Sequence, residues 1–231
     1  MKTSTIRRIH RWLGLIFSLS ILASSLSGVV HTLMAHKQPP PPAVKPSGHF
    51  LDPSGIRIGT AEAMKKLGAD FGQVGAINLR VIGGEPWYQI YGSAPVPAYV
   101  NSVDGRFDPS QDEKYGAEIA ERFLGGAKVQ KTDYLTSFNN EYVNIFRVLP
   151  VYRFDSSDGE GTRVYVSTTT GSVTRYTNDK MQFEANIFMN FHKFAFIPNR
   201  MARDIAMVTV TGGAALVALA GVFLFFYTRR R

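Results

Sequence analysis

The sequence predicts an α+β domain held between two transmembrane helices. Residues 12–34 and 206–228 each run for 23 residues without Asp, Glu, Lys or Arg. Because a helix of roughly 20 apolar residues crosses the hydrocarbon core of a bilayer, both segments are long enough to span it. The chain between them mixes helix-like and strand-like runs with ordinary polar content, as soluble domains do.

The basic residues predict the orientation of these helices. Of the net charge of +8, seven charges lie in the two tails, which contain no acidic residue. The positive-inside rule therefore places both termini in the cytoplasm and the domain on the far side, which in a bacterial inner membrane is the periplasm. The tail residues are Lys2, Arg7, Arg8 and Arg11 at the start and Arg229, Arg230 and Arg231 at the end. Topology explains this basic excess, so no nucleic-acid partner is expected.

The first apolar segment is interpreted as an uncleaved anchor. A cleaved signal peptide would have a shorter apolar core, of about 7–15 residues, and a small-residue cleavage site. The residues that follow, Leu33, Met34 and Ala35, do not form such a site. The chain has no cysteine, which excludes disulfides, thiolate catalysis, iron–sulfur ligation and covalent c-type haem attachment.

The central domain shows the same order of elements twice. A helix at 60–67 precedes strands at 76–82, 87–91 and 98–101, and a helix at 117–124 precedes strands at 142–149, 151–154, 163–167 and 171–173. The pattern Tyr-Val-x4-Gly occurs at Tyr99 and again 66 residues later at Tyr165. We interpret this as a duplication with repeats at about 55–108 and 112–178, although unrelated halves of an α+β domain can also share such an order.

The predicted organisation divides the chain into seven segments. It consists of a basic tail (1–11), a first transmembrane helix (12–34), a proline-rich linker (35–49), an α+β domain (50–180), an aromatic interfacial segment (181–198), a second transmembrane helix (203–228) and a short tail (229–231). Four consecutive prolines favour an extended linker, and Pro198 is expected to separate the interfacial segment from the second helix.

Three of the five histidines lie at membrane boundaries and are the candidate ligands. His10 and His31 are separated by about 31 Å along a helix that rises ~1.5 Å per residue, so they cannot share a metal ion. His31 and His192 both belong to the far-side boundary and can meet. Their imidazoles could ligate the iron of a non-covalent b-type haem, with small residues on both helices leaving room for it. The alternative is that they are interfacial anchors and that the small residues serve helix packing.

The other histidines have weaker claims. No histidine lies at the cytoplasmic end of the second helix, so a haem at His10 would need a ligand from another subunit; otherwise His10 is a polar residue flanking the membrane. His36 and His49 are interpreted as solvated or structural. No hydrolase, P-loop or dinucleotide-binding motif is present.

Three stretches resemble the PepSY-associated transmembrane family. They are Arg7 to Leu15 at the opening helix, Pro150 to Phe154 with Thr162 to Val166 and Thr170 to Val173 at the end of the domain, and Phe191 to Phe194 leading into the closing helix. The resemblance implies PepSY-like repeats and a relation to inner-membrane reductases that pass electrons to ferric siderophores through haems. By position, it makes His10, His31 and His192 the ligand candidates. Those reductases have four membrane helices, so two helices imply a homodimer or a partner membrane subunit.

Two hypotheses follow from this sequence. The first is a haem b electron-transfer protein whose acceptor is a ferric siderophore or a periplasmic redox protein. It would serve as a component of a reductase, and the sequence identifies no catalytic residue for it. The second is a non-enzymatic, membrane-anchored binding module that regulates or assembles envelope proteins.

Overall fold

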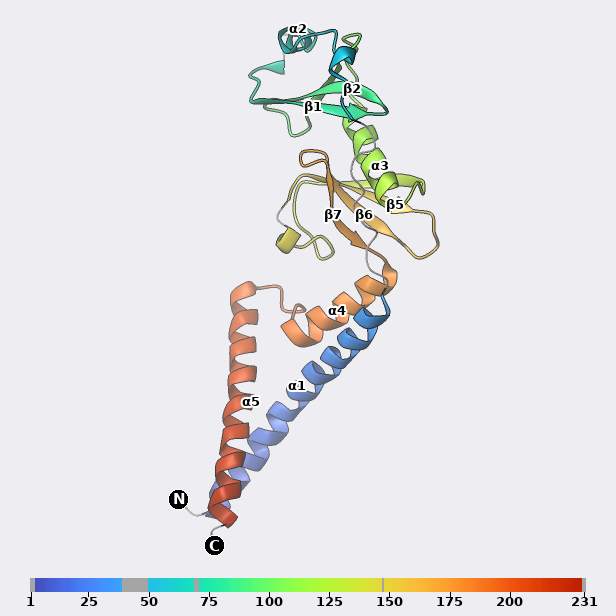
Figure 1. The fold of residues 1–231 in the computed structure, drawn as a ribbon. Helices are drawn as coiled ribbons and strands as arrows, with labels where there is room; N and C mark the ends of the chain where they lie inside the picture. The colour runs from blue at the N-terminus through green and yellow to red at the C-terminus, as the bar shows by residue number, and fades with distance from the viewer. Residues whose placement is uncertain (1–2, 39–49, 69–70, 147, 230–231) are drawn as a thin grey trace. The chain divides into compact units, whose positions relative to one another are not determined.

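The computed structural model describes residues 3–38, 50–68, 71–146 and 148–229 (Figure 1). The chain divides into two compact units. The helical unit consists of Met1–Pro39 and Lys180–Arg231, and the α+β unit consists of Pro40–Asp179. The helical unit contains α1 (Thr3–Lys37), most of α4 (Asp179–Lys193) and α5 (Arg200–Arg229).

In the described residues of the α+β unit, two α-helices accompany two antiparallel sheets. Its elements are α2 (Thr60–Lys65), β1 (Ala76–Ile82), β2 (Glu85–Tyr91), β3 (Ala98–Asn101), α3 (Gln111–Phe123), β4 (Val129–Leu135), β5 (Val151–Ser156), β6 (Arg163–Ser167) and β7 (Ser172–Thr177), with 3-10 turns at Pro53–Gly55 and Asn144–Phe146. The strand orders are β1-β2-β3 and β4-β5-β6-β7, so each sheet is a meander in which sequential strands pair.

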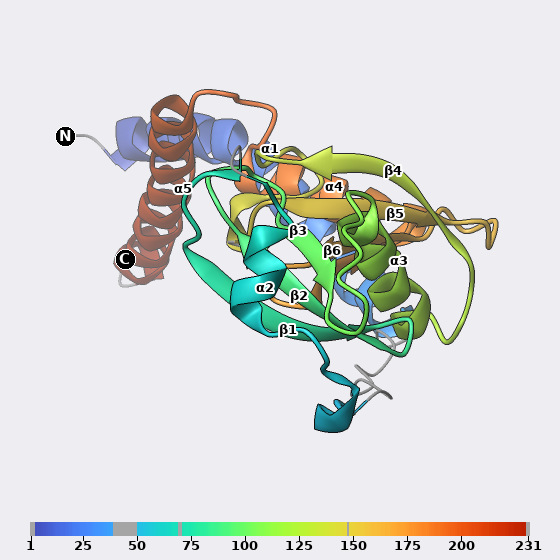
Figure 2. The ribbon, with the colours of Figure 1, turned by 90° about the horizontal axis from the view of Figure 1, so that it is seen from above.

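The first sheet buries both of its faces because its strands alternate between two cores. Tyr88 and Ile90 pack with Ala63 of α2 on one face, whereas Trp87 and Tyr99 pack against α3 on the other. Figure 2 shows α2 crossing this sheet. Successive side chains on a strand point to opposite faces, which explains the division.

Helix α3 joins the two sheets. Tyr115, Ile119 and Phe123 belong to the same buried cluster as Trp87 and Tyr99 of the first sheet and Phe154, Val164 and Val166 of the second. A Cβ at Gly116 would lie 3.1 Å from the Phe154 ring. The glycine therefore lets α3 approach the second sheet closely.

The two halves of the α+β unit share an order of elements. In each, a helix precedes an antiparallel meander, and the predicted pattern Tyr-Val-x4-Gly falls on the third strand of the sheet. Gly105 and Gly171, which end the two patterns, have φ of 76° and 66°. Both turns therefore need the left-handed conformation that glycine adopts without strain.

The prediction of a strand at 142–149 is wrong. The segment instead contains the 3-10 turn Asn144–Phe146. Its apolar residues cover the second sheet: Tyr142 is fully buried, stacks on Tyr165 and donates a hydrogen bond to the carbonyl of Val148. The sequence also failed to indicate β4, because this edge strand is mostly exposed, contains charged residues, and has an irregular register between Lys131 and Asp133.

Two helices, Ser4–Lys37 within α1 and Arg200–Tyr227 within α5, are long and apolar enough to cross a membrane. Only 6% of the most apolar window in each is buried. A core helix of a soluble protein would be mostly buried, so this exposure favours contact with lipid. Helix α1 begins at Thr3, nine residues before the predicted first span, and α5 begins at Arg200, three residues before the predicted second span. Helix α4 ends at Lys193, and Pro198 lies between it and α5.

Candidate functional site: a histidine–carboxylate interface in the helical unit

His31 and His192 both lie where α1 packs against α4, each next to the ring of Phe188. Glu184, Phe188 and His192 recur every four residues on α4 and therefore lie on one face of that helix. Ser24 and His31 are seven residues apart on α1, two turns along one face. His31 bonds Glu184 and His192 bonds Ser24, so the two helices run antiparallel at this interface.

His31 is held by a buried carboxylate. Its Nδ1 contacts Oε1 of Glu184 in a short hydrogen bond or ion pair. The Glu184 side chain is only 9% exposed, whereas that of His31 is 48% exposed. Burying a carboxylate is unfavourable unless it is paired, so the imidazole is the group that makes the burial of Glu184 tolerable.

His192 is held in a similar way by a hydroxyl. Its Nδ1 lies 3.0 Å from Oγ of Ser24. The Phe188 ring packs against both imidazoles, with centroids 4.6 Å from His192 in a stacked arrangement and 4.8 Å from His31 in a tilted one. The structure therefore brings both His31 and His192 against one residue, Phe188.

This arrangement leaves the same atom available on both imidazoles. When Nδ1 carries the proton and donates it to Glu184 or Ser24, the Nε2 lone pair is free to bind a metal ion. Among the described residues, neither Nε2 has a hydrogen-bond partner. A histidine whose Nδ1 donates to a carboxylate is the usual arrangement of metal-binding histidines, since the carboxylate fixes the tautomer and raises the basicity of the ligand.

The donor chemistry fits haem iron, but the space as it stands does not. The pocket beside His192 lies between α1, α4 and α5 and encloses about 160 Å³, with Ser20, Ser24, Phe191 and Thr211 among its walls. Pockets for organic ligands usually enclose about 300–1,000 Å³. A macrocycle between the two imidazoles would require Phe188 to leave its position. Among the described residues, no group of three or more His, Cys, Asp or Glu side chains could hold a metal ion.

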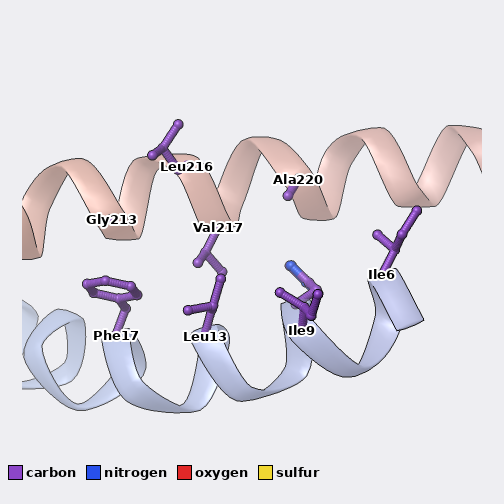
Figure 3. Close-up of a pocket in the computed structure, with 9 residues that line it drawn as sticks. Ile6, Ile9, Leu13, Phe17, Gly213, Leu216, Val217 and Ala220 are labelled. Carbon is purple, nitrogen blue, oxygen red and sulfur yellow. The ribbon is translucent and has the colours of Figure 1, made fainter. Parts of the chain in front are cut away.

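His10 lies elsewhere, at the crossing of α1 and α5. A Cβ at Gly221 would lie 3.2 Å from Cε1 of His10, so the glycine makes room for the imidazole. The groove beside it encloses about 390 Å³. As Figure 3 shows, its walls are apolar side chains from both helices, with the Phe17 ring opposite Gly213. Nδ1 of His10 is buried and has no hydrogen-bond partner in the part of the chain that the structure describes.

The small residues predicted to leave room for a ligand serve different purposes. Gly213 accommodates the Phe17 ring, whereas a Cβ at Gly212 or Gly28 would meet nothing within 4 Å. His36 lies exposed at the end of α1, and His49 falls outside the described residues. Sequence reasoning missed Glu184 and Phe188. The signal that could have revealed them is the pattern Glu-x3-Phe-x3-His, in which Glu184, Phe188 and His192 follow one another at intervals of four residues.

The chain matches no protein-family model, and searches of curated proteins and of solved structures find no match.

Proposed function

We propose that this chain is a haem b-binding electron-transfer protein of the bacterial inner membrane. The helical unit would hold the haem through Nε2 of His31 and His192, and the α+β unit would lie in the periplasm with both termini in the cytoplasm. The observation that carries the proposal is that both imidazoles are anchored through Nδ1, which leaves Nε2 free on each. Haem iron would supply a one-electron carrier within the bilayer.

The chain's own residues would orient the two histidine ligands and form part of the surroundings of the haem. Glu184 would fix the rotation and tautomer of His31, and Ser24 would fix the rotation of His192. Phe188 must rotate away from both rings, and the exposed aromatic side chains of α4, such as Phe183 and Phe191, are suited to the headgroup region that surrounds such a site. Two membrane helices do not enclose a haem, so a second copy of the chain or a partner membrane subunit would supply the missing walls.

The resemblance to the PepSY-associated transmembrane family suggests the direction of transfer. Electrons would pass to a periplasmic acceptor, such as a ferric siderophore or a redox protein, and the chain would act as a component of a reductase. His10 is the third ligand candidate, and a haem there would need its second ligand from another subunit.

A second function is favoured by the packing around Phe188. The Phe188 ring packs against both imidazoles, and the neighbouring pocket encloses only about 160 Å³. In this second function the interface is a structural clamp that fixes α4 to α1. The chain would then be an anchored, non-enzymatic module whose α+β unit, with its PepSY-like repeats, binds and regulates envelope proteins.

An absorption spectrum of the full chain, purified in detergent from haem-replete cells, separates the two functions. Haem binding predicts a sharp α-band on dithionite reduction that is lost in His31→Ala and in His192→Ala. His36→Ala is the matched control, because His36 lies on the same helix, is exposed, and should leave the band unchanged. A colourless wild-type protein would refute the electron-transfer function and leave the clamp.

A further inference from the structure

The α+β unit buries a carboxyl group at the start of α3. Asp112 is the second residue of the helix and is only 1% exposed. Helix termini favour negative charge near their first turn, but charges in that position are normally solvated. Burial of this carboxylate is therefore unfavourable unless each of its two oxygens has a compensating partner.

The first oxygen belongs to a chain of hydrogen bonds that crosses the unit. The hydroxyl of Tyr99 donates to Oδ1 of Asp112 over 2.6 Å. Nε2 of Gln89 donates to the Tyr99 hydroxyl over 2.6 Å and to the carbonyl of Thr168 over 3.0 Å. Since Thr168 follows β6, the network ties the first sheet and α3 to the turn between β6 and β7.

A parallel link strengthens the same connection. Nε of Arg80 donates to Oε1 of Gln89 over 3.1 Å, and a guanidinium nitrogen of Arg80 donates to the carbonyl of Thr169 over 2.9 Å. Gln89 is fully buried and therefore uses both ends of its amide in the join between the halves. Through the Tyr99 hydroxyl, Gln89 is also linked to Asp112.

The second oxygen of Asp112 is not satisfied. Oδ2 is buried and accepts no hydrogen bond of ordinary geometry within the described residues. The titratable groups that interact with Asp112 are Tyr99 on β3, Tyr134 on β4 and Tyr152 on β5. Glu113 is its charged neighbour on α3, and the Thr168 hydroxyl lies nearby. No lysine or arginine of the described residues pairs with Asp112.

These surroundings favour the neutral acid. Burial raises the pKa of Asp112, and the nearby hydroxyls of Tyr99, Thr168 and Tyr152 offset this only in part. Burial also raises the pKa of Tyr99 and of Tyr152, and the charge of Asp112 raises both further, so these phenols stay protonated. A protonated carboxyl has one O–H donor, and Oδ2, which has no hydrogen-bond partner within the described residues, is the oxygen that can carry this proton.

We propose that Asp112 forms a proton-dependent clasp between the two halves of the α+β unit. In the closed state Oδ1 accepts from Tyr99, and Oδ2 carries a proton that it donates to the hydroxyl oxygen of Thr168 or Tyr152. When the pH rises, the proton is lost to solvent, a buried charge is left without a cationic partner, and the start of α3 loosens from the turn after β6. The α+β unit thereby responds to the acidity of the compartment that surrounds it.

The direction of the pH effect follows from linkage. Because the folded pKa of Asp112 is raised, its contribution to stability is complete below the unfolded value of about 3.9 and is lost as pH rises through the folded value. Between the unfolded and the folded pKa of Asp112, each rise of one pH unit lowers the folding equilibrium constant about tenfold. For a unit of this size, that corresponds to a fall of about 5 °C in midpoint temperature.

The test is a comparison of pH profiles for thermal unfolding of the full chain in detergent. Trp87, which is 2% exposed in the core shared with α3, reports unfolding by fluorescence in a Trp12→Phe background. Asp112→Asn mimics the neutral acid, since its amide keeps the acceptor for Tyr99 and a donor at the second position. Asp108→Asn is the matched control, because Asp108 lies four residues earlier and is paired with Lys114.

The clasp predicts that Asp112→Asn matches the wild type near pH 4 and unfolds at a higher temperature at pH 8. Asp108→Asn should keep the wild-type slope above pH 5. Asp112→Ala, which removes the hydrogen bond to Tyr99, should be less stable than Asp112→Asn at every pH. Parallel profiles for wild type and Asp112→Asn would overturn the proposal. So would an Asp112→Asn variant that is less stable than the wild type at pH 8.

Discussion

Removing either partner of the His31–Glu184 pair should destabilise the α1–α4 interface, but not equally. His31→Ala leaves a carboxylate that is 9% exposed without its partner, whereas Glu184→Ala leaves an imidazole that is 48% exposed. An unsatisfied buried group costs about 1–3 kcal/mol, and more when it is charged, while a half-exposed one can be solvated. His31→Ala also removes the ring contact with Phe188, which contributes about 0.5–1.5 kcal/mol.

The expected losses are therefore about 3 kcal/mol for His31→Ala and about 1 kcal/mol for Glu184→Ala. The measurement is hydrogen exchange of the α4 backbone amides in detergent micelles, which reports the free energy of local opening. The difference of about 2 kcal/mol corresponds to roughly a thirtyfold difference in the opening equilibrium. His36→Ala should change it by less than about 0.5 kcal/mol. Equal losses for the two alanine variants, or a larger loss for Glu184→Ala, would refute the assignment of Glu184 as the buried, dependent partner.

The helix crossing and the acidic loop before α3 provide further tests. Gly213→Ala should destabilise the α1–α5 contact by about 1–3 kcal/mol, since its Cβ would overlap the Phe17 ring. Gly212→Ala, next to it but facing open space, should be neutral or stabilising by up to about 1 kcal/mol; cross-linking yields between α1 and α5 would compare them. Lys114 and Ser110 lower the pKa of Asp108 to about 2. Its contribution of about 1 kcal/mol is therefore present above pH 4 and lost between pH 4 and pH 2, a loss that Asp108→Asn should remove from acid-unfolding profiles.

The fold was predictable where one physical rule dominates a segment. The two membrane-length helices follow from charge-free runs, and the β1–β2 hairpin follows from alternation across Gly83 and Gly84, which adopt the positive φ that the turn needs. The 142–149 segment defeated the same reasoning, because an apolar run that covers a sheet as a loop has the composition of a strand. β4 was missed for the opposite reason: an edge strand that is solvated on most of its length has too little apolar alternation.

The candidate site was predictable only in part. Boundary position and the family resemblance pointed to His31 and His192, and the structure does bring them to one interface. Glu184 could not be distinguished by sequence from a solvated acid in an amphipathic helix, because its burial depends on how α4 packs against α1. Asp112 presents the same difficulty, since an acidic residue in the first turn of a helix is ordinarily a surface residue.

The low-temperature electron paramagnetic resonance spectrum of the ferric full chain tests the haem proposal most directly. Ligation by both His31 and His192 predicts a low-spin signal in the wild type and in His36→Ala. Loss of one axial ligand in His31→Ala or His192→Ala should convert it to a high-spin signal or abolish it. A wild-type sample without a ferric haem signal, or a low-spin signal that survives both substitutions, would contradict the account.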